Sequence, residues 1–200
     1  MSASIYQNMV KNAGQINLSK YSRESRNWLL KQYTSVQRGS VREKTFLSQN
    51  DRRRNKIMPG RMYMFSYDPK LKATLPYYDA FPLVFPIGPA KDGFLGLNLH
   101  YLPPILRARF FDALSELEVN GELQNERTKI LMTYNLLASA ARYRYFKPCI
   151  KHYLYSQLKS SFIYVPPEEW NITLFLPSHN FKKASVDVVW KDSRKIINQS

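Results

Sequence analysis

Three polar side chains in the middle of the sequence, Asp68, Asp79 and His100, could support metal-dependent cleavage of a phosphodiester. Two carboxylates and an imidazole can hold a divalent cation, which activates a water molecule and stabilises the leaving oxygen. A structural interpretation fits these residues better, because Asp68 precedes Pro69 and Asp79 precedes Ala80. At such turn positions an aspartate side chain accepts hydrogen bonds from nearby backbone N–H groups. We therefore expect no catalytic residue here, and a metal-dependent nuclease is only the third hypothesis for the function.

Motifs for other catalytic chemistry are absent from the sequence. The seven glycines form neither GxGxxG nor GxxxxGK[ST], two common loops that bind nucleotide phosphates. HExxH, GxSxG and CxxC are also missing. Cys149 is the only cysteine, so it cannot form a disulfide within the chain, and the three histidines lie far apart in the sequence. These features predict a protein that is not an enzyme and that holds no metal and no cofactor.

Positive charge is the strongest functional signal in the sequence. Thirty Lys and Arg stand against fifteen Asp and Glu, and the net charge of +15 predicts attraction to a polyanion. Eight basic side chains are the predicted phosphate contacts: Arg52, Arg53, Arg54, Lys56, Arg61, Arg142, Arg144 and Lys147. If about six to ten such side chains met phosphates, rising salt would weaken binding by roughly three to five decades. No helix-turn-helix, zinc-finger or RNP pattern is present, so we expect binding that is independent of base sequence.

Two other interpretations of this charge stay open at this point. A basic run can be a solvated face without a ligand, and it can also meet acidic surfaces of partner proteins. An acidic membrane surface would also attract this charge, but no apolar run approaches the roughly 20 residues that a membrane-spanning helix needs, and we expect no membrane partner.

The charge is concentrated at the amino-terminal end of the chain. Residues 1–60 hold twelve Lys or Arg and three Asp or Glu, whereas residues 61–200 hold eighteen and twelve. The first segment is also rich in Ser, Asn and Gln, which is typical of a chain that does not pack on itself. We expect residues 1–58 to form a basic, partly extended arm. Trp28, Leu29, Tyr33 and Val36 recur at helical spacing within it, so a short amphipathic helix could contact a partner there through Trp28 and Tyr33.

The rest of the chain, residues 59–200, is expected to form a single α+β domain. Residues 59–103 are β-rich, with strands over 62–67, 81–87 and 94–102 that prolines and Gly96 bend. Such short, bent strands favour a small SH3-like or OB-like barrel. Residues 104–200 are expected to be mainly helical and to cover the open side of this barrel. Helices are predicted over residues 106–117, with Arg107 on the polar side, and over 122–141, 148–162 and 185–197, with a short one after residue 166.

Aromatic residues concentrate in the β-rich part of the domain. They are Tyr63, Phe65, Tyr67, Tyr77, Tyr78, Phe81, Phe85 and Tyr101. A domain with so few residues in its barrel needs large side chains to fill its core, so we expect most of them to be buried. The alternative is that exposed rings stack on unpaired bases.

Three long segments of the sequence carry a resemblance to a known family. They are Pro59–Lys70 (PGRMYMFSYDPK), Gly93–Pro103 (GFLGLNLHYLP) and Lys147–Leu154 (KPCIKHYL). Together with Leu75–Asp79 and Phe81–Val84, they resemble virion proteins of T-even-like contractile-tailed phages. Among these, the sequence is most similar to the head-completion proteins that protect the ends of packaged DNA. The resemblance covers residues from about 60 to 165.

The resemblance implies a non-enzymatic virion protein at the head–tail junction that binds and protects the end of packaged double-stranded DNA. Its other partners would be virion proteins of the junction or tail, and a homo-oligomer is compatible with this location. The alternative is a tail or baseplate subunit whose arm makes protein–protein contacts through Trp28 and Tyr33. The resemblance points to no DNA-contacting residue, so the predicted phosphate contacts rest on charge alone.

Overall fold

The computed structural model describes residues 50–103, 106–107, 144–166, 170, 173 and 178–199 of the 200-residue chain. Most of the predicted arm, with Trp28 and Tyr33, lies outside these residues, as does Arg142. The predicted helix over residues 122–141 also lies outside them, and the one over 106–117 is described only at its first two positions. Arg144 is described by its backbone alone.

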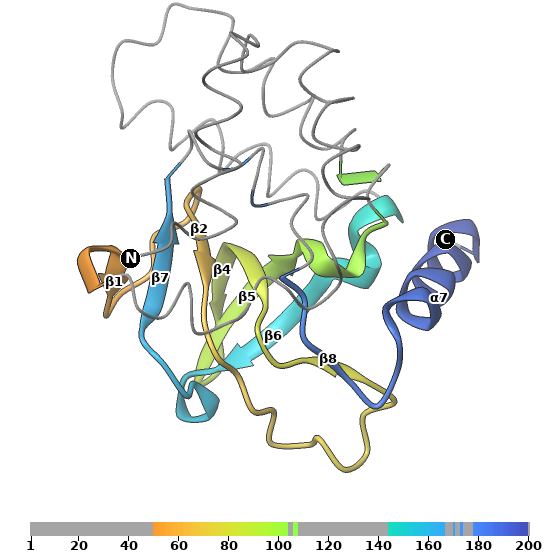
Figure 1. The fold of residues 1–200 in the computed structure, drawn as a ribbon, viewed down its shortest axis with the longest axis horizontal. Coiled ribbons are helices and arrows are strands. Elements are labelled where there is room, and N and C mark those ends of the chain that lie inside the picture. Colours follow the sequence, from red (N-terminus) through yellow and green to blue (C-terminus); the bar gives the residue numbers. More distant parts are fainter. Residues whose placement is uncertain are drawn as a thin grey trace, which may run out of the picture.

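The main element is a six-stranded antiparallel sheet with strand order β1-β7-β2-β4-β5-β6 (Figure 1). Its strands are β1 (Arg53–Arg54), β2 (Met62–Met64), β4 (Leu83–Ala90), β5 (Gly93–Asn98), β6 (Ile150–Leu154) and β7 (Phe162–Val165). Four short 3-10 helices flank the strands: η1 (Asn50–Arg52), η2 (Leu99–Tyr101), η3 (Arg144–Cys149) and η4 (Tyr155–Gln157).

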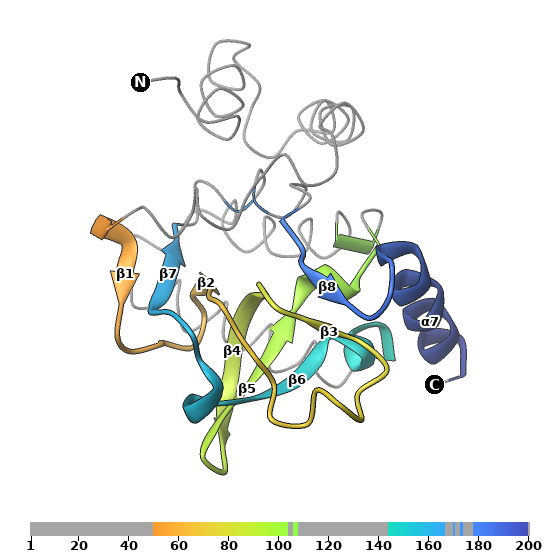
Figure 2. The same cartoon turned by 60° about the horizontal axis from the view of Figure 1, so that its bottom comes forward.

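A second, two-stranded sheet lies beside the first. It consists of β3 (Tyr78–Asp79) and β8 (Phe181–Lys182), and β8 leads directly toward the helix α7 (Val186–Gln199). Figure 2 shows β3 and β8 side by side, with α7 at the same end of the molecule. Segments that are far apart in the sequence therefore meet at this end.

The central strands of the six-stranded sheet carry buried residues on both faces. On one face, Met62 and Met64 of β2 belong to the main core, which α7 covers through Val189 and Ile197. On the other face, Tyr63 of β2 belongs to an aromatic cluster: Tyr63, Phe65, Tyr67, Val84, Phe94, Tyr153 and Phe162. Alternate residues of a strand point to opposite faces, so the period-two pattern of the sequence supplies both cores.

Close packing of β5 against β6 requires glycine at one position. A Cβ atom at Gly93 would overlap the backbone carbonyl oxygen of Tyr153 on the neighbouring strand. The turn before it contains Asp92 with a φ of 57°, which suits the tight β4–β5 hairpin. These two residues place β5 where it can pair with β6 over most of its length.

The predicted strands and the final helix are confirmed. Strands β2, β4 and β5 overlap the three predicted ranges, although the third range gives way to the 3-10 helix η2 at Leu99. Helix α7 begins one residue after the predicted start, and Val186, Val189, Trp190, Ser193 and Ile197 form its buried side. The aromatic residues are mostly core, as predicted.

The predicted helix over residues 148–162 is wrong. Residues 150–154 form β6 instead, and they pair with β5 from Leu97 to Gly93. The apolar spacing of this short segment fits a helix or a strand, and the unpaired edge of β5 decides in favour of a strand. Tyr153 then packs on Phe94, with ring centroids 5.4 Å apart.

The expected position of Arg107 and the expected barrel both differ from what the structure shows. Arg107, predicted on the polar side of a helix, is fully buried, and its Nε donates to the backbone oxygen of Leu102 at 2.7 Å. The broad α+β class holds, but the described sheet does not close into a barrel, because β1 and β6 are its two edges. Within the described residues, no helix is long and apolar enough to cross a membrane.

Candidate nucleic-acid interface

The basic run predicted to contact phosphates is built into the edge of the main sheet. Arg53 and Arg54 form β1 and pair with Ile163 and Phe162 of β7. Nη1 of Arg54 donates to the backbone oxygens of Asp51 and Arg53, each at 2.8 Å, which ties its guanidinium to the edge strand. Both arginines are exposed, so β1 presents positive charge to solvent.

Arg53 and Arg54 lie on opposite faces of the sheet. Cross-strand partners in an antiparallel pair share a face, so Arg53 lies on the face of Ile163, which belongs to the main core. Arg54 lies on the face of Phe162 and Tyr164, next to the aromatic cluster. Two neighbouring residues of the same charge therefore have different surroundings.

A turn brings a further cation to the same end of the sheet. The backbone N–H of Arg61 donates to the oxygen of Met58 at 3.3 Å, and Gly60 has a φ of 78°. Proline at the second position and a positive φ at the third are typical of a type II turn, which glycine enters without strain. The turn places Met58 at the surface, 45% exposed, and Arg61 immediately before β2.

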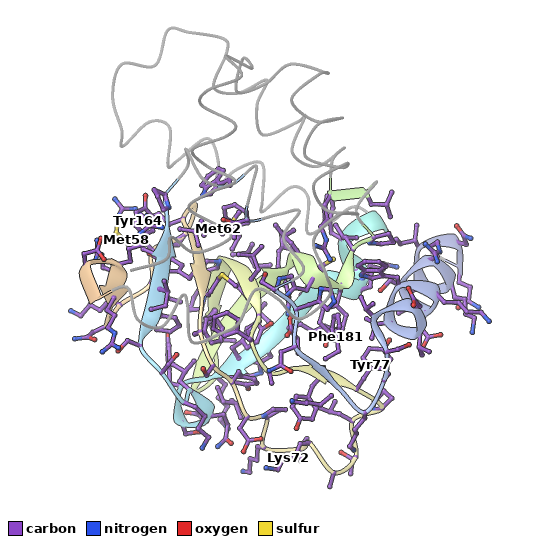
Figure 3. All side chains as sticks on the ribbon, viewed as in Figure 1. Met58, Met62, Lys72, Tyr77, Tyr164 and Phe181 are labelled. Carbon is purple, nitrogen blue, oxygen red and sulfur yellow. The ribbon has the colours of Figure 1, made fainter. Side chains whose placement is uncertain are left out.

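Tyr164 of β7 lies between two guanidinium groups from the segments on either side. The Cζ atom of Arg54 lies 5.7 Å from the centre of the Tyr164 ring, and that of Arg61 lies 5.4 Å from it. Both distances are within the range of cation–π attraction. Figure 3 shows Tyr164 and Met58 together at this end of the molecule. Tyr164 in turn packs on Tyr63, whose hydroxyl accepts a hydrogen bond from the backbone N–H of Met58 at 3.0 Å.

The predicted phosphate contacts fall into two separate groups. Arg53, Arg54, Lys56 and Arg61 lie at or beside the β1 edge, and Arg52 ends η1 immediately before it. The backbone of Arg144 and the exposed Lys147 lie in η3, which leads into β6 at the opposite edge of the sheet (Figure 1). The sequence did not indicate this separation, because it depends on the strand order.

A buried network of hydrogen bonds surrounds Asp79, one of the two aspartates with the chemistry of a metal ligand. Its Oδ2 accepts from Asn98 at 3.1 Å and lies 2.7 Å from Nδ1 of His100. Its Oδ1 accepts from the backbone N–H groups of Phe81 at 3.1 Å and Asn180 at 3.0 Å. The carboxylate thus holds β3, the end of β5 and the segment before β8 together. The predicted bond from a nearby backbone N–H group to Asp79 is confirmed by its bond to Phe81, although Asp79 lies in the strand β3 and not in a turn.

Burial and charge set the protonation states in this network. Burial alone would raise the pKa of Asp79, but the imidazole of His100 and the N–H donors outweigh it and hold that pKa below its usual value. Burial lowers the pKa of His100, against the opposing effect of the Asp79 carboxylate. A neutral His100 donates from Nδ1 to Asp79, so its Nε2 accepts from Oγ of Ser178 at 3.0 Å.

The Asp79–His100–Ser178 sequence of bonds is that of a serine-hydrolase triad, but its surroundings make it structural. The ring of His100 is completely buried and Ser178 is only 5% exposed, so a substrate carbonyl has no access to the hydroxyl. Asp68 is separately engaged, with Lys72 at 2.9 Å in an exposed loop. In the described part of the chain, no three His, Cys, Asp or Glu side chains come close enough to share a metal ion.

Comparison with known families identifies what kind of protein carries this basic edge. The family described as phage T4 terminal DNA protecting protein matches residues 23–193. The chain belongs to this family. The match covers the β1 edge, Tyr164 and the Asp79 network, and it extends beyond the range of about 60–165 that the sequence resemblance suggested. No curated protein and no solved structure matches the chain.

Membership of the terminal DNA protecting family confirms the resemblance and the protection of DNA ends that it implied. The family's description names DNA and its terminus, so the polyanion that the positive charge attracts is DNA. The description does not name an enzymatic activity.

Proposed function

We propose that the protein binds the end of linear double-stranded DNA through phosphate contacts at the β1 edge and shields that end from exonucleases without cutting it. The observation that carries the proposal is the gathering of Arg53, Arg54, Lys56 and Arg61 at one edge of a sheet in a terminal DNA protecting protein. Phosphate contacts of this kind do not depend on base sequence, which suits a protein that must protect any packaged genome end.

The proposal extends to the organisation and location of the protein. Residues 1–58 act as a basic arm whose last part supplies β1 to the main sheet, and residues 59–200 form the rest of the domain. The protein works in the virion at the head–tail junction, where its neighbours are other virion proteins and, if the junction has rotational symmetry, further copies of itself. The matched family range, which begins at residue 23, supports a shared role for arm and domain.

A charge-reversal experiment tests the phosphate contacts. The triple variant Arg52→Glu, Arg53→Glu and Lys56→Glu changes exposed or half-buried side chains of the β1 edge and leaves the cores intact. Binding to a linear duplex should weaken and exonuclease protection should fall. The slope of log K against log salt should flatten by about 0.9 for each phosphate that the variant no longer neutralises.

The matched control is Lys182→Glu, Lys191→Glu and Arg194→Glu, which makes the same change of net charge at exposed positions of β8 and α7. If the control weakens binding as much as the first variant, the protein responds to net charge and the β1 edge is not the contact surface.

The location has its own test. DNA-filled phage heads that lack tails should contain the protein, because the DNA end is already present in them. If the protein is found only in particles with tails, the tail or baseplate alternative is favoured, and the positive charge then serves contacts with acidic proteins.

A further inference from the structure

The end of a DNA duplex offers a protein a surface that the interior of the duplex lacks. Along the interior the outer surface is phosphate, sugar and base edges, whereas the end exposes the flat π-face of the terminal base pair. Phosphate contacts alone therefore attract a protein to any part of the duplex. A planar or apolar surface beside the cations would add a preference for the end, and base stacking on such a surface is tolerant of sequence.

Such a surface lies at the β1 end of the sheet. Tyr164 is flanked by the guanidiniums of Arg54 and Arg61 at 5.7 and 5.4 Å, and Met58 beside them is 45% exposed. Arg54 is exposed, whereas Tyr164 and Arg61 are half-buried. A guanidinium is planar and stacks on aromatic faces, so one that lies against a tyrosine ring can present its outer side to a base.

The surface is also held in place before any DNA arrives. Two backbone oxygens accept hydrogen bonds from Arg54, the Pro59-Gly60 turn sets the position of Arg61, and Tyr63 supports Tyr164 from the aromatic cluster. Pre-ordered side chains lose less conformational entropy on binding. Met58 is fixed by its backbone bond to the Tyr63 hydroxyl.

We infer that Arg54, Arg61, Tyr164 and Met58 form a cap for the terminal base pair of double-stranded DNA, and that this cap gives the protein its preference for ends. The inference deepens the proposed function and rests on it. Phosphate contacts by residues such as Arg53 and Lys56 supply affinity for any duplex, while the cap distinguishes an open end from the interior.

The test compares two duplexes of the same sequence and nearly the same charge, one with blunt ends and one with both ends closed by hairpin loops. Hairpin loops cover the terminal base pairs but leave the phosphates in place. The full-length protein should bind the blunt duplex more tightly, by a factor of roughly 5 to 100 if one stacked base pair accounts for the difference. A 2-aminopurine at the blunt terminus should change its fluorescence on binding.

Variants assign the preference to the cap. Arg54→Lys keeps the charge and removes the planar guanidinium, so it should weaken binding to the blunt duplex more than binding to the hairpin duplex and reduce the blunt-to-hairpin preference at least severalfold. Tyr164→Ala and Met58→Ala should act in the same direction, and Tyr164→Phe should keep the preference because it keeps the ring. Arg53→Ala is the matched control in the same strand on the other face, and it should weaken binding to both duplexes equally.

Failure of the inference is distinguishable from failure of the proposed function. If the wild-type protein binds both duplexes equally and still protects linear DNA, or if Arg54→Lys weakens both equally, the cap is wrong and phosphate binding stands. If the wild-type protein binds neither duplex, the proposed function itself fails. Circular dichroism and thermal unfolding of Tyr164→Ala identify a loss of folding, and Arg54→Lys keeps the test valid in that case because Arg54 is exposed.

Discussion

The Nδ1 atom of His100 lies 2.7 Å from Oδ2 of Asp79, and both side chains are withdrawn from solvent. The backbone of His100 takes part as well, because its oxygen accepts from Nε1 of Trp190 at 2.9 Å and from Arg107 at 3.1 Å. Through these bonds, one histidine joins β3, η2 and α7. The pair is therefore a structural junction between the small sheet and the terminal helix.

Replacing Asp79 by Asn should destabilise the fold without affecting DNA binding directly. The change removes the charge that His100 and two backbone N–H groups satisfy, and a hydrogen bond to a charged group contributes about 1.5–3 kcal/mol to stability. Urea unfolding measures the loss. Asp68→Asn is the matched control, because Asp68 pairs with an exposed lysine. The urea midpoint of this variant should equal that of the wild type. Equal midpoints for the two variants would contradict the structural role of Asp79.

Stability should fall as the pH is lowered below neutrality. The pKa of His100 in the folded protein lies below its usual value of 6.5, so the unfolded chain takes up the proton first and gains stability relative to the fold. The loss begins near pH 6.5 and continues as the pH approaches the folded-state pKa. Asp79, whose folded-state pKa is also lowered, adds a further loss below its usual value of 3.8. Unfolding free energies from pH 7 to 5 measure the first window.

The control for this pH dependence is His100→Gln, which keeps a polar side chain but does not titrate. The free energy of unfolding of this variant should change less between pH 7 and pH 5 than that of the wild type. An unchanged slope in His100→Gln would show that other groups carry the pH dependence. In the wild type, Arg107 also faces this site, and its positive charge helps to keep the imidazole neutral by lowering the pKa of His100.

Two glycines of the same hairpin should respond oppositely to alanine. At Gly93 the new methyl group would overlap the oxygen of Tyr153, so β5 and β6 would have to separate, at a cost of about 1–3 kcal/mol. At Gly88 a Cβ atom has no neighbour within 4 Å, and Gly88→Ala should be neutral or stabilising by up to about 1 kcal/mol. Thermal unfolding distinguishes them, and similar values for both variants would contradict the close approach of β5 to β6.

Cys149 should be inert toward thiol reagents in the native protein. The side chain is fully buried, and burial raises its pKa to about 12, so almost no thiolate is present near pH 8. Labelling by a chromogenic disulfide reagent should be slow and should follow global unfolding as urea is added. Fast labelling without denaturant would show that η3 opens locally.

Sequence patterns predicted the elements whose periodicity is unambiguous. Alternation at Met62, Tyr63 and Met64 indicated a strand, and the apolar spacing from Val186 to Ile197 indicated α7. The same approach failed at residues 150–154. Five residues fit both the two-residue period of a strand and the 3.6-residue period of a helix, and pairing with β5 makes this segment a strand. Arg107 was misplaced because periodicity reports a helix face but not what packs against it.

The candidate site was predictable in its charge but not in its geometry. The run at residues 52–54 was evident from composition, and the local bond from Asp79 to Phe81 follows from turn chemistry. Ser178 and Asn180 were missed as partners because they lie 78 and 101 residues from the groups that they contact. Tyr164 was missed because its position between Arg54 and Arg61 depends on the insertion of β7 between β1 and β2.

The insertion of β7 between β1 and β2 also has a consequence for biosynthesis. In the described sheet, β1 pairs with β7 alone, and their sequences are separated by more than one hundred residues. A ribosome must therefore complete Phe162–Val165 before Arg53 and Arg54 have a strand to join, and such distant pairings close slowly. The growing polypeptide carries these two arginines without their partner strand while more than one hundred further residues are added. Only a chain that has been made as far as β7 can assemble the edge for which we propose contacts with DNA.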